Sequence, residues 1–183
     1  MWPREKKLMI SHSKDRIDLV ALFAACALFL STIEYMIPKP VPFMRLGLAN
    51  LPLILALGIF SNREYFLLLL LKVLGQGLIS GTIFSYIILF SLAGSLSSAI
   101  LMLLVYTLFK DKITRVGISL AGALGSTITQ LIVSRIILFK EATYVIAPLF
   151  LISGLISSII LGLFANEFIS KSAWYAQLKE VNA

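Results

Sequence analysis

Residues 65–109 read YFLLLLLKVLGQGLISGTIFSYIILFSLAGSLSSAILMLLVYTLF, and Lys72 is the only charged side chain among them. A run this apolar is much longer than the roughly 20 residues that one helix needs to cross a bilayer. Gly75, Gly77 and Gly81 interrupt it, and we expect a break near Ser80-Gly81-Thr82. The run therefore predicts two membrane helices, Tyr65 to Ile79 and Phe84 to Phe109.

The composition of the whole chain extends this pattern. Of its 183 residues, 59% are hydrophobic and 14% are charged, whereas an ordinary soluble domain has about 25% charged residues. Lipid offers the backbone no hydrogen bonds, so only helices or closed barrels can span it. The apolar runs are continuous rather than alternating, which favours helices. We therefore expect one all-α integral membrane domain, a compact bundle of six transmembrane helices.

Four further apolar runs complete this bundle. They predict helices at Ile17 to Ile37, Leu48 to Phe60, Val116 to Phe139 and Tyr144 to Ile169. The first run is longer than the core of a signal peptide, about 7–15 residues, and is interpreted as a retained helix. The second is short for a span, and its helix could begin nearer Phe43. We expect residues 1–16 to be a cytoplasmic N-terminal segment, 17–170 the transmembrane domain and 171–183 a cytoplasmic tail.

The net charge of +7 comes from basic residues that gather at the ends of the apolar runs. If all six runs cross with the N-terminus inside, eleven Lys and Arg residues lie inside and three outside, whereas without the second crossing only six stay inside. The positive-inside rule therefore predicts six spans, both termini cytoplasmic, in a multi-pass plasma-membrane protein that binds no nucleic acid. The eleven are Arg4, Lys6, Lys7, Lys14, Arg16, Arg63, Lys110, Lys112, Arg115, Lys171 and Lys179, and the three are Lys39, Arg45 and Lys140.

The sequence has no pattern typical of an enzyme. It lacks a glycine-rich phosphate loop followed by lysine and a nucleophile elbow. Its three aspartates, Asp15, Asp18 and Asp111, are scattered, whereas a magnesium-diphosphate enzyme needs clustered carboxylates. Cys26 and His12 are each the only residue of their kind, so they predict neither a disulfide nor a metal site. We expect no catalysis, no cofactor and no bound metal.

Polar groups within the predicted helices form the candidate ligand site, because charge inside a membrane is costly and usually functional. By their depth in antiparallel helices they converge on the outer half of the bundle. Three are cationic and one is anionic, a balance that suits a ligand with a carboxylate or phosphate. The candidate substrate-binding residues are Lys72, Gln76, Asn50, Gln130, Arg135, Arg45 and Glu34.

Structural interpretations of these residues stay open. Arg45 and Arg135 could reach the outer headgroups, and Lys72 could pair with Glu34 as a purely structural contact. The two amides, Asn50 and Gln130, could be ordinary hydrogen bonds between helices.

Several short elements resemble a known family. Arg45-Leu46-Gly47-Leu48-Ala49-Asn50 follows a proline-rich outer loop, and Gly81-Thr82 precedes Phe90-Ser91-Leu92-Ala93-Gly94-Ser95-Leu96-Ser97-Ser98. The pair Gly122-Ala123 precedes Gln130. Together they resemble the Gx transporter family, labelled heptaprenyl diphosphate synthase component I, over nearly the whole chain from Ile17. That family is similar to the substrate-binding (S) components of energy-coupling factor (ECF) transporters.

The resemblance implies a six-helix fold with a high-affinity ligand pocket on the outer side. Ala21 and Ala25 have the small-xxx-small spacing that lets another helix approach closely. The resemblance implies that they face a transmembrane coupling subunit, driven by two ATPase subunits. Ser126-Thr127 stand where the family often has a His-Asn pair, and Thr129 replaces a glycine. This departure leaves open whether the ligand or its pose differs from the family norm.

The leading hypothesis is an S component that captures a small, anionic, micronutrient or vitamin-like ligand from outside and uses the ATP hydrolysis of partner subunits. One alternative is a non-catalytic membrane subunit linked to prenyl diphosphate or quinone synthesis. Another is a structural subunit of a different membrane complex.

Overall fold

The computed structural model describes residues 13–38, 44 and 46–182, and every regular element in these ranges is helical. Short 3₁₀ or π turns connect several of the α-helices. The α-helices are α1 (Ser13–Met36), α2 (Leu51–Ala56), α3 (Asn62–Ile79), α4 (Ile87–Phe109), α5 (Arg115–Ser134), α6 (Thr143–Lys171) and α7 (Ala173–Asn182). The turns are η1 (Leu48–Asn50), η2 (Lys110–Lys112), η3 (Arg135–Phe139) and η4 (Lys140–Ala142).

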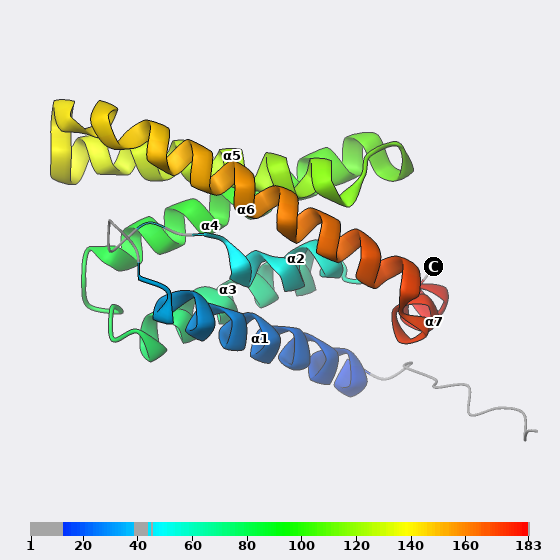
Figure 1. Cartoon of the computed structure of the whole chain (residues 1–183). Coiled ribbons are helices and arrows are strands. Elements are labelled where there is room, and N and C mark those ends of the chain that lie inside the picture. The colour runs from blue at the N-terminus through cyan, green and yellow to red at the C-terminus, as the bar shows by residue number, and fades with distance from the viewer. Residues whose placement is uncertain (1–12, 39–43, 45, 183) are drawn as a thin grey trace, which may run out of the picture.

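The helices alternate in direction along the molecule (Figure 1). The connections 80–86 and 135–142 lie at one end, here called the η3 end. The connections 57–61 and 110–114 lie at the opposite end, together with α7 and the start of α1. We call this opposite end the α7 end. The direction of each of the six predicted helical runs therefore agrees with an up-and-down bundle.

The lengths and compositions of the helices support some of the six predicted spans but not all of them. In the part of the chain that the structure describes, four helical stretches are long and apolar enough to cross a membrane: Arg16–Met36, Ile87–Phe109, Arg115–Leu138 and Lys140–Lys171. The helix α3 has 18 residues and contains the charged Lys72, and it is not among the four. The membrane character of the chain is thus supported, while the six-span topology stays a prediction.

The predicted helix from Leu48 to Phe60 is much shorter in the structure. The turn η1 and the six-residue α2 replace it, and α2 ends at Ala56. The next residues leave the helical region, because Leu57 is extended and Gly58 has φ of +90°. Six helical residues rise about 9 Å, a fraction of the roughly 30 Å hydrocarbon core of a bilayer. By itself α2 is too short to cross it.

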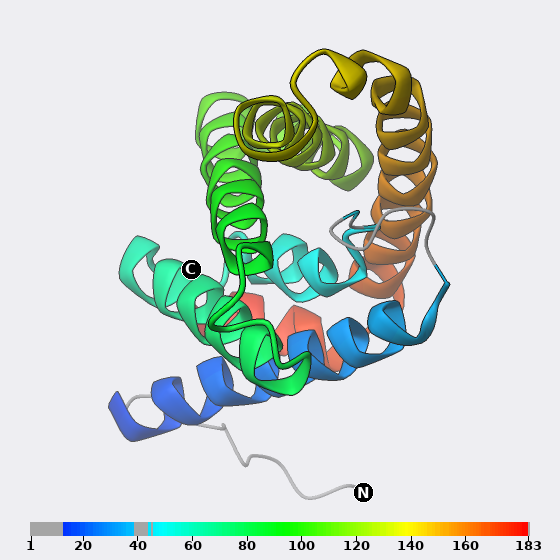
Figure 2. The same cartoon turned by 90° about the vertical axis from the view of Figure 1, so that its left-hand side faces the viewer.

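This short helix is the centre of the bundle. It contacts α1, α3, α5 and α6, and Figure 2 shows it surrounded by the long helices when the molecule is viewed from the η3 end. Its Leu53 and Ile54 are fully buried, as is Leu57 just beyond it. The core therefore forms around a segment whose own backbone is irregular at both ends, which a membrane protein tolerates where protein covers that backbone.

The C-terminal tail, predicted only as a polar segment, contains the helix α7. Tyr175 and Leu178 of this helix are buried in the core, and the Tyr175 hydroxyl donates to the carbonyl oxygen of Leu55 at 2.9 Å. These two apolar side chains are three residues apart, so they lie on one face of a helix. The hydrogen bond ties α7 to the central α2.

Two glycines illustrate how the backbone allows this arrangement. The predicted break near Ser80-Gly81-Thr82 is confirmed, since α3 ends at Ile79 and Gly81 adopts a φ of +65°. In α6, a Cβ atom at Gly162 would lie 2.4 Å from the Cα of Val116 in α5. Only glycine allows these two helices to approach so closely at that point.

Candidate functional site

Glu34, near the end of α1, holds the segment that enters η1. Its side chain is only 2% exposed. Its two carboxylate oxygens accept hydrogen bonds from the backbone amides of Leu46 and Leu48, at 2.9 and 2.8 Å. Gly47 between them has φ of +85°, the left-handed conformation that glycine adopts without strain. The structure thus gives this carboxylate the role of anchoring a backbone turn.

Lys72 of α3 meets the end of the same turn. Its ammonium group donates a hydrogen bond to the side-chain oxygen of Asn50, and Lys72 is 3% exposed. A buried ammonium group needs such partners, because removal of a charge from water is expensive. Three of the predicted site residues, Glu34, Asn50 and Lys72, are therefore joined by the five residues from Leu46 to Asn50.

A small cavity lies beside Asn50, between η1, α2, α4, α5 and α6. Its volume is about 20 Å³, room for about one water molecule. Its polar lining consists of one amide and four hydroxyl groups: Asn50, Ser119, Ser126, Thr127 and Ser158. Leu46 and Gly47, from the turn that Glu34 anchors, also line it. The cavity can form neutral hydrogen bonds close to one buried cation.

Gln130 lies one turn beyond Ser126 on α5, toward the η3 end. It is buried, and its amide nitrogen donates to the Ser126 hydroxyl at 2.7 Å. Its side-chain oxygen has no hydrogen-bond partner among the described residues. The hydroxyl groups of several buried neighbours on α4, α5 and α6 also have none there: Ser91, Ser98, Ser134 and Thr143. Several buried hydrogen-bonding groups in this part of the bundle therefore have no partner among the described residues.

The structure does not bring Arg135 into this group. Its side chain, in η3, is 52% exposed and forms an ion pair with Glu141 at 3.2 Å. Its guanidinium carbon lies 5.1 Å from the ring centroid of Tyr144.

The two remaining predicted site residues are Gln76 and Arg45. Gln76 is half-buried on α3, and its backbone oxygen accepts a hydrogen bond from the Ser80 hydroxyl. Arg45 lies outside the described residues.

The predicted docking residues lie on the outer surface of α1. Ala21 and Ala25 are exposed, whereas Ala24, in the same run, is buried in the core. Leu22 and Phe29 are also exposed on this helix. A small-residue site within an apolar surface is available to another helix or to lipid.

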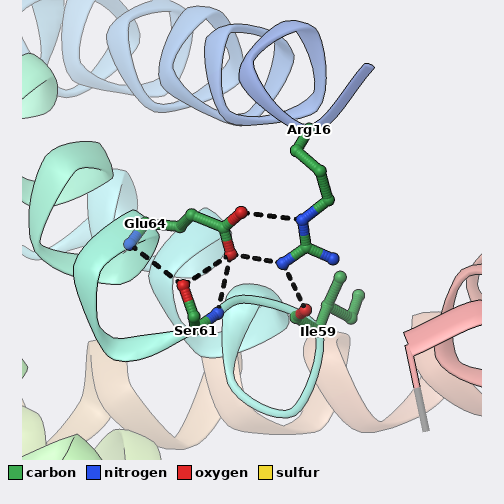
Figure 3. Close-up of polar contacts among 4 residues, drawn as sticks. All are labelled: Arg16, Ile59, Ser61 and Glu64. Carbon is green, nitrogen blue, oxygen red and sulfur yellow. Dashed lines mark hydrogen bonds and ion pairs between the residues drawn. The ribbon is translucent and has the colours of Figure 1, made fainter. Parts of the chain in front are cut away.

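A polar contact that the sequence analysis missed joins α1 to the start of α3 (Figure 3). The Arg16 guanidinium forms two hydrogen bonds with the Glu64 carboxylate, of which Nε to Oε1 measures 2.7 Å. Glu64 also closes a capping box with Ser61 at the N-terminus of α3. The hydrogen bond from Arg16, aided by those from Ser61, lowers the pKa of Glu64 to about 2. A Ser-x-x-Glu pattern before an apolar run is a sequence signal for this box.

Of the hydroxyl groups that line the cavity, the sequence analysis noted Ser126 and Thr127 only as a departure from the family pattern, and it missed Ser119 and Ser158. Ser119, Ala123, Ser126 and Thr127 recur at helical spacing on one face of α5. That periodicity was available in the sequence, but it does not tell whether such a face meets lipid, another helix or a cavity. Among the described residues, no group of three His, Cys, Asp or Glu side chains could hold a metal ion.

Comparison with known proteins agrees with the family resemblance. No curated protein sequence and no solved structure matches the chain. Residues 23–168 match the family model described as heptaprenyl diphosphate synthase component I, and they include α2 to α5 and most of α1 and α6. The chain belongs to the heptaprenyl diphosphate synthase component I family.

Proposed function

We propose that this protein is a membrane-embedded S component of an ECF-type importer, which binds a small anionic ligand that enters from the η3 end. The observation that carries the proposal is the buried Lys72, held by Asn50 at the edge of a hydroxyl-lined cavity. A cation that deep in a membrane domain is rarely retained without a functional reason. In a low-dielectric site it attracts an anion strongly, provided that the contact compensates the desolvation of both groups.

The hydroxyl groups near Lys72 would orient the rest of the ligand. Ser119, Ser126 and Ser158 supply donors and acceptors on α5 and α6. Small-molecule sites typically combine such a few polar groups with apolar walls, here from Ile54, Met102 and Leu161. A micronutrient with one acidic group and several neutral polar groups would match this lining.

Ligand entry requires the cavity to open. Its volume of about 20 Å³ is far below the roughly 300–1,000 Å³ of typical small-molecule sites. The movable part in this proposal is the turn from Leu46 to Asn50, which lines the cavity and is hydrogen-bonded to α1 through Glu34. This turn would close over the ligand from the outer side.

Energy for transport would come from partners, through the exposed Ala21 and Ala25 on α1. The sequence has no phosphate-binding loop of its own. A coupling subunit with helices that pack on these small residues, together with two ATPase subunits, would complete the importer.

The family description favours a second candidate function, a non-catalytic membrane subunit linked to prenyl diphosphate synthesis. The scattered acidic residues of the chain argue against a catalytic role. In this alternative, the chain would bind a prenyl-synthesising enzyme rather than a coupling subunit.

Affinity purification from native membranes separates the two functions. The proteins and the small molecules that co-purify would be identified together by mass spectrometry. A coupling subunit with ATPases and an acidic small molecule would support the importer. A prenyl diphosphate synthase subunit without any such ligand would contradict it.

Two variants then test the site. Lys72→Met should reduce retention of the co-purified anion by about 30-fold or more, because loss of one buried charge partner costs about 2–5 kcal/mol. Asn50→Asp keeps the size of the side chain and places a negative charge beside Lys72, so it should have a similar effect. Lys112→Met, in the exposed turn η2, is the matched control. If both site variants retain the anion as the wild type does and unfold at the same temperature, the proposed site is wrong.

A further inference from the structure

The central helix α2 ends in a stretch of backbone that needs hydrogen-bond partners from outside. The last four carbonyl groups of an α-helix have no partner within the helix, and α2 has only six residues. The carbonyl oxygen of Ala56 accepts the backbone amides of Ile59 and Phe60, at 3.1 and 3.0 Å. The chain then turns away at the extended Leu57 and at Gly58. Other carbonyl groups of this stretch depend on donors elsewhere in the fold.

Three of these carbonyl groups, at alternate positions, are bonded by three different helices. We call residues 55–59 the α2 exit. The donors are Tyr175 of α7 for Leu55, at 2.9 Å, Arg115 of α5 for Leu57, at 3.5 Å, and Arg16 of α1 for Ile59, at 3.4 Å. Figure 3 shows the last of these contacts. The α2 exit is therefore suspended between the ends of three helices at the α7 end of the molecule.

Tyr175 makes the strongest of the three contacts. Its hydrogen bond has a normal length and its side chain is only 1% exposed. The two arginine contacts are at the long limit for a hydrogen bond. Arg16 also binds the carboxylate of Glu64. The position of the α2 exit thus depends most on α7.

The helix α7 is itself held by few contacts. Among its residues 173–180, only Tyr175 and Leu178 are buried. Trp174 is 43% exposed, and its ring stacks on Phe23 of α1 with the centroids 6.3 Å apart. Ser172, which is extended, separates α7 from the long α6. A segment with few buried apolar contacts opens at low free energy, so α7 can leave its place while the long helices stay packed.

The opposite end of α2 meets the cavity. Asn50 directly precedes α2, and both Asn50 and Ile54 line the cavity. Ile54 is the neighbour of Leu55, whose carbonyl group Tyr175 holds. Leu53 and Ile54 are fully buried, and a close-packed segment transmits a displacement rather than absorbing it. A movement at the α2 exit therefore reaches the wall of the cavity.

We propose that α7 is a latch on α2, and that Tyr175 is a positioning residue for the cavity wall. While Tyr175 holds Leu55, Asn50 and Ile54 keep the cavity at its closed volume of about 20 Å³. Displacement of α7 frees α2 to shift and lets the cavity open. A partner that binds α7 would thereby change ligand access at the far side of α2. This latch takes its functional meaning from the proposed ligand site, whereas the link between α7 and the cavity stands on the contacts alone.

A thiol placed in the cavity reports whether it opens. The full chain, purified in detergent, carries Cys26→Ser, because the native cysteine is exposed, and Ser158→Cys as the reporter. Ser158 lines the cavity and is 2% exposed, so iodoacetamide should alkylate this position slowly, as followed by intact mass spectrometry. Addition of Tyr175→Phe keeps the ring and removes the hydroxyl. It should raise the alkylation rate by up to about tenfold, because loss of one hydrogen bond favours the open form by that factor.

Two further variants separate the latch from a general loss of stability. Leu178→Ala weakens the docking of α7 without touching the hydrogen bond, and it should also raise the alkylation rate. Thr114→Ala is the matched control. The Thr114 hydroxyl caps α5 at the same end of the molecule, where it accepts the Gly117 amide at 3.2 Å. Its loss should destabilise the fold by a similar amount and leave the alkylation rate as it was.

Wild-type alkylation rates in both Tyr175→Phe and Leu178→Ala, or an equal rise in Thr114→Ala, would overturn the latch. A rise in Leu178→Ala alone would overturn the role of Tyr175. The measurement needs no ligand, so its failure is distinct from failure of the proposed importer. The latch can be wrong while Lys72→Met still loses the co-purified anion, and it can be right where no such anion is found.

Discussion

The Lys72 ammonium of α3 donates a hydrogen bond to the Asn50 side chain at the end of η1, across 22 residues of sequence. This contact joins a long helix to the irregular turn that precedes the central α2. It places a buried cation beside the cavity, and it makes the geometry of that turn depend on α3.

The first prediction concerns the energy of this contact. Asn50→Leu should lower the free energy of unfolding by about 1–3 kcal/mol, because it removes an acceptor from a buried donor. Lys72→Met in the same background should recover part of the loss, since both partners are then apolar. A double-mutant cycle measured by unfolding in detergent would give the coupling. Strictly additive effects of the two substitutions would contradict a direct contact.

The second prediction concerns topology. A cysteine at Lys140, between α5 and α6, should react with a membrane-impermeant thiol reagent added outside intact cells. A cysteine at Lys112, between α4 and α5, should react only after the membrane is opened. Both variants should carry Cys26→Ser, because the native cysteine is exposed in the isolated chain. Labelling of the Lys112 position from outside would reverse the predicted orientation.

The third prediction concerns the exposed small residues of α1. Ala21→Trp or Ala25→Trp should prevent co-purification of the coupling subunit, because a bulky side chain keeps a partner helix at a distance. Retention of the small-molecule ligand should not change. Ile128→Trp, at an exposed position on α5, is the control for a bulky residue on an apolar surface. Normal assembly of both alanine variants would exclude this docking face.

The fourth prediction concerns acid. The pKa of Glu64 is lowered from 4.5 to about 2, chiefly by the hydrogen bond from Arg16. A carboxyl group with a depressed pKa stabilises the fold fully above its unfolded pKa and loses this effect as the pH falls through its folded pKa. The stability advantage of the wild type over Glu64→Gln should therefore be constant above about pH 5 and shrink from about pH 4.5 toward 2. Chemical unfolding at several pH values would measure it, and an advantage independent of pH would count against the ion pair.

The fifth prediction concerns the contact between α5 and α6. Gly162→Ala should destabilise the protein by about 1–3 kcal/mol, because its Cβ would lie 2.4 Å from the Cα of Val116 and the helices would have to separate. Leu163→Ala, at an exposed position of the same helix, should have a much smaller effect. Equal unfolding free energies for Gly162→Ala and the wild type would show that the two helices can move apart without cost.

Much of the helical architecture could be predicted from hydropathy. The runs now seen as α1, α3, α4, α5 and α6 were each expected within a few residues of their observed bounds, and so was the break at Gly81. The length of α2 and the existence of α7 could not be predicted in the same way. The first depends on a local backbone reversal at Gly58, and the second on the burial of Tyr175 against α2.

Some residues of the candidate site could likewise be selected from the sequence, and others could not. Depth in the predicted helices was enough to select Glu34, Asn50 and Lys72, which the structure joins through one turn. It could not distinguish them from Arg135, which stands at a helix end and pairs with a neighbour in sequence, Glu141. Position along a helix gives depth, but the direction of a side chain depends on how each helix is rotated in the bundle.

By itself, the sequence determined that this chain is a helical membrane protein of a recognisable family, because apolar run length and charge at the run ends are local properties that sum along the chain. Only the tertiary structure decided which polar groups meet. Glu34 turned out to hold backbone amides 12 and 14 residues away, and Arg16 to hold a carboxylate 48 residues away. Such pairings follow from the packing of whole helices, in which a buried polar group bonds to whichever partner the fold brings within reach.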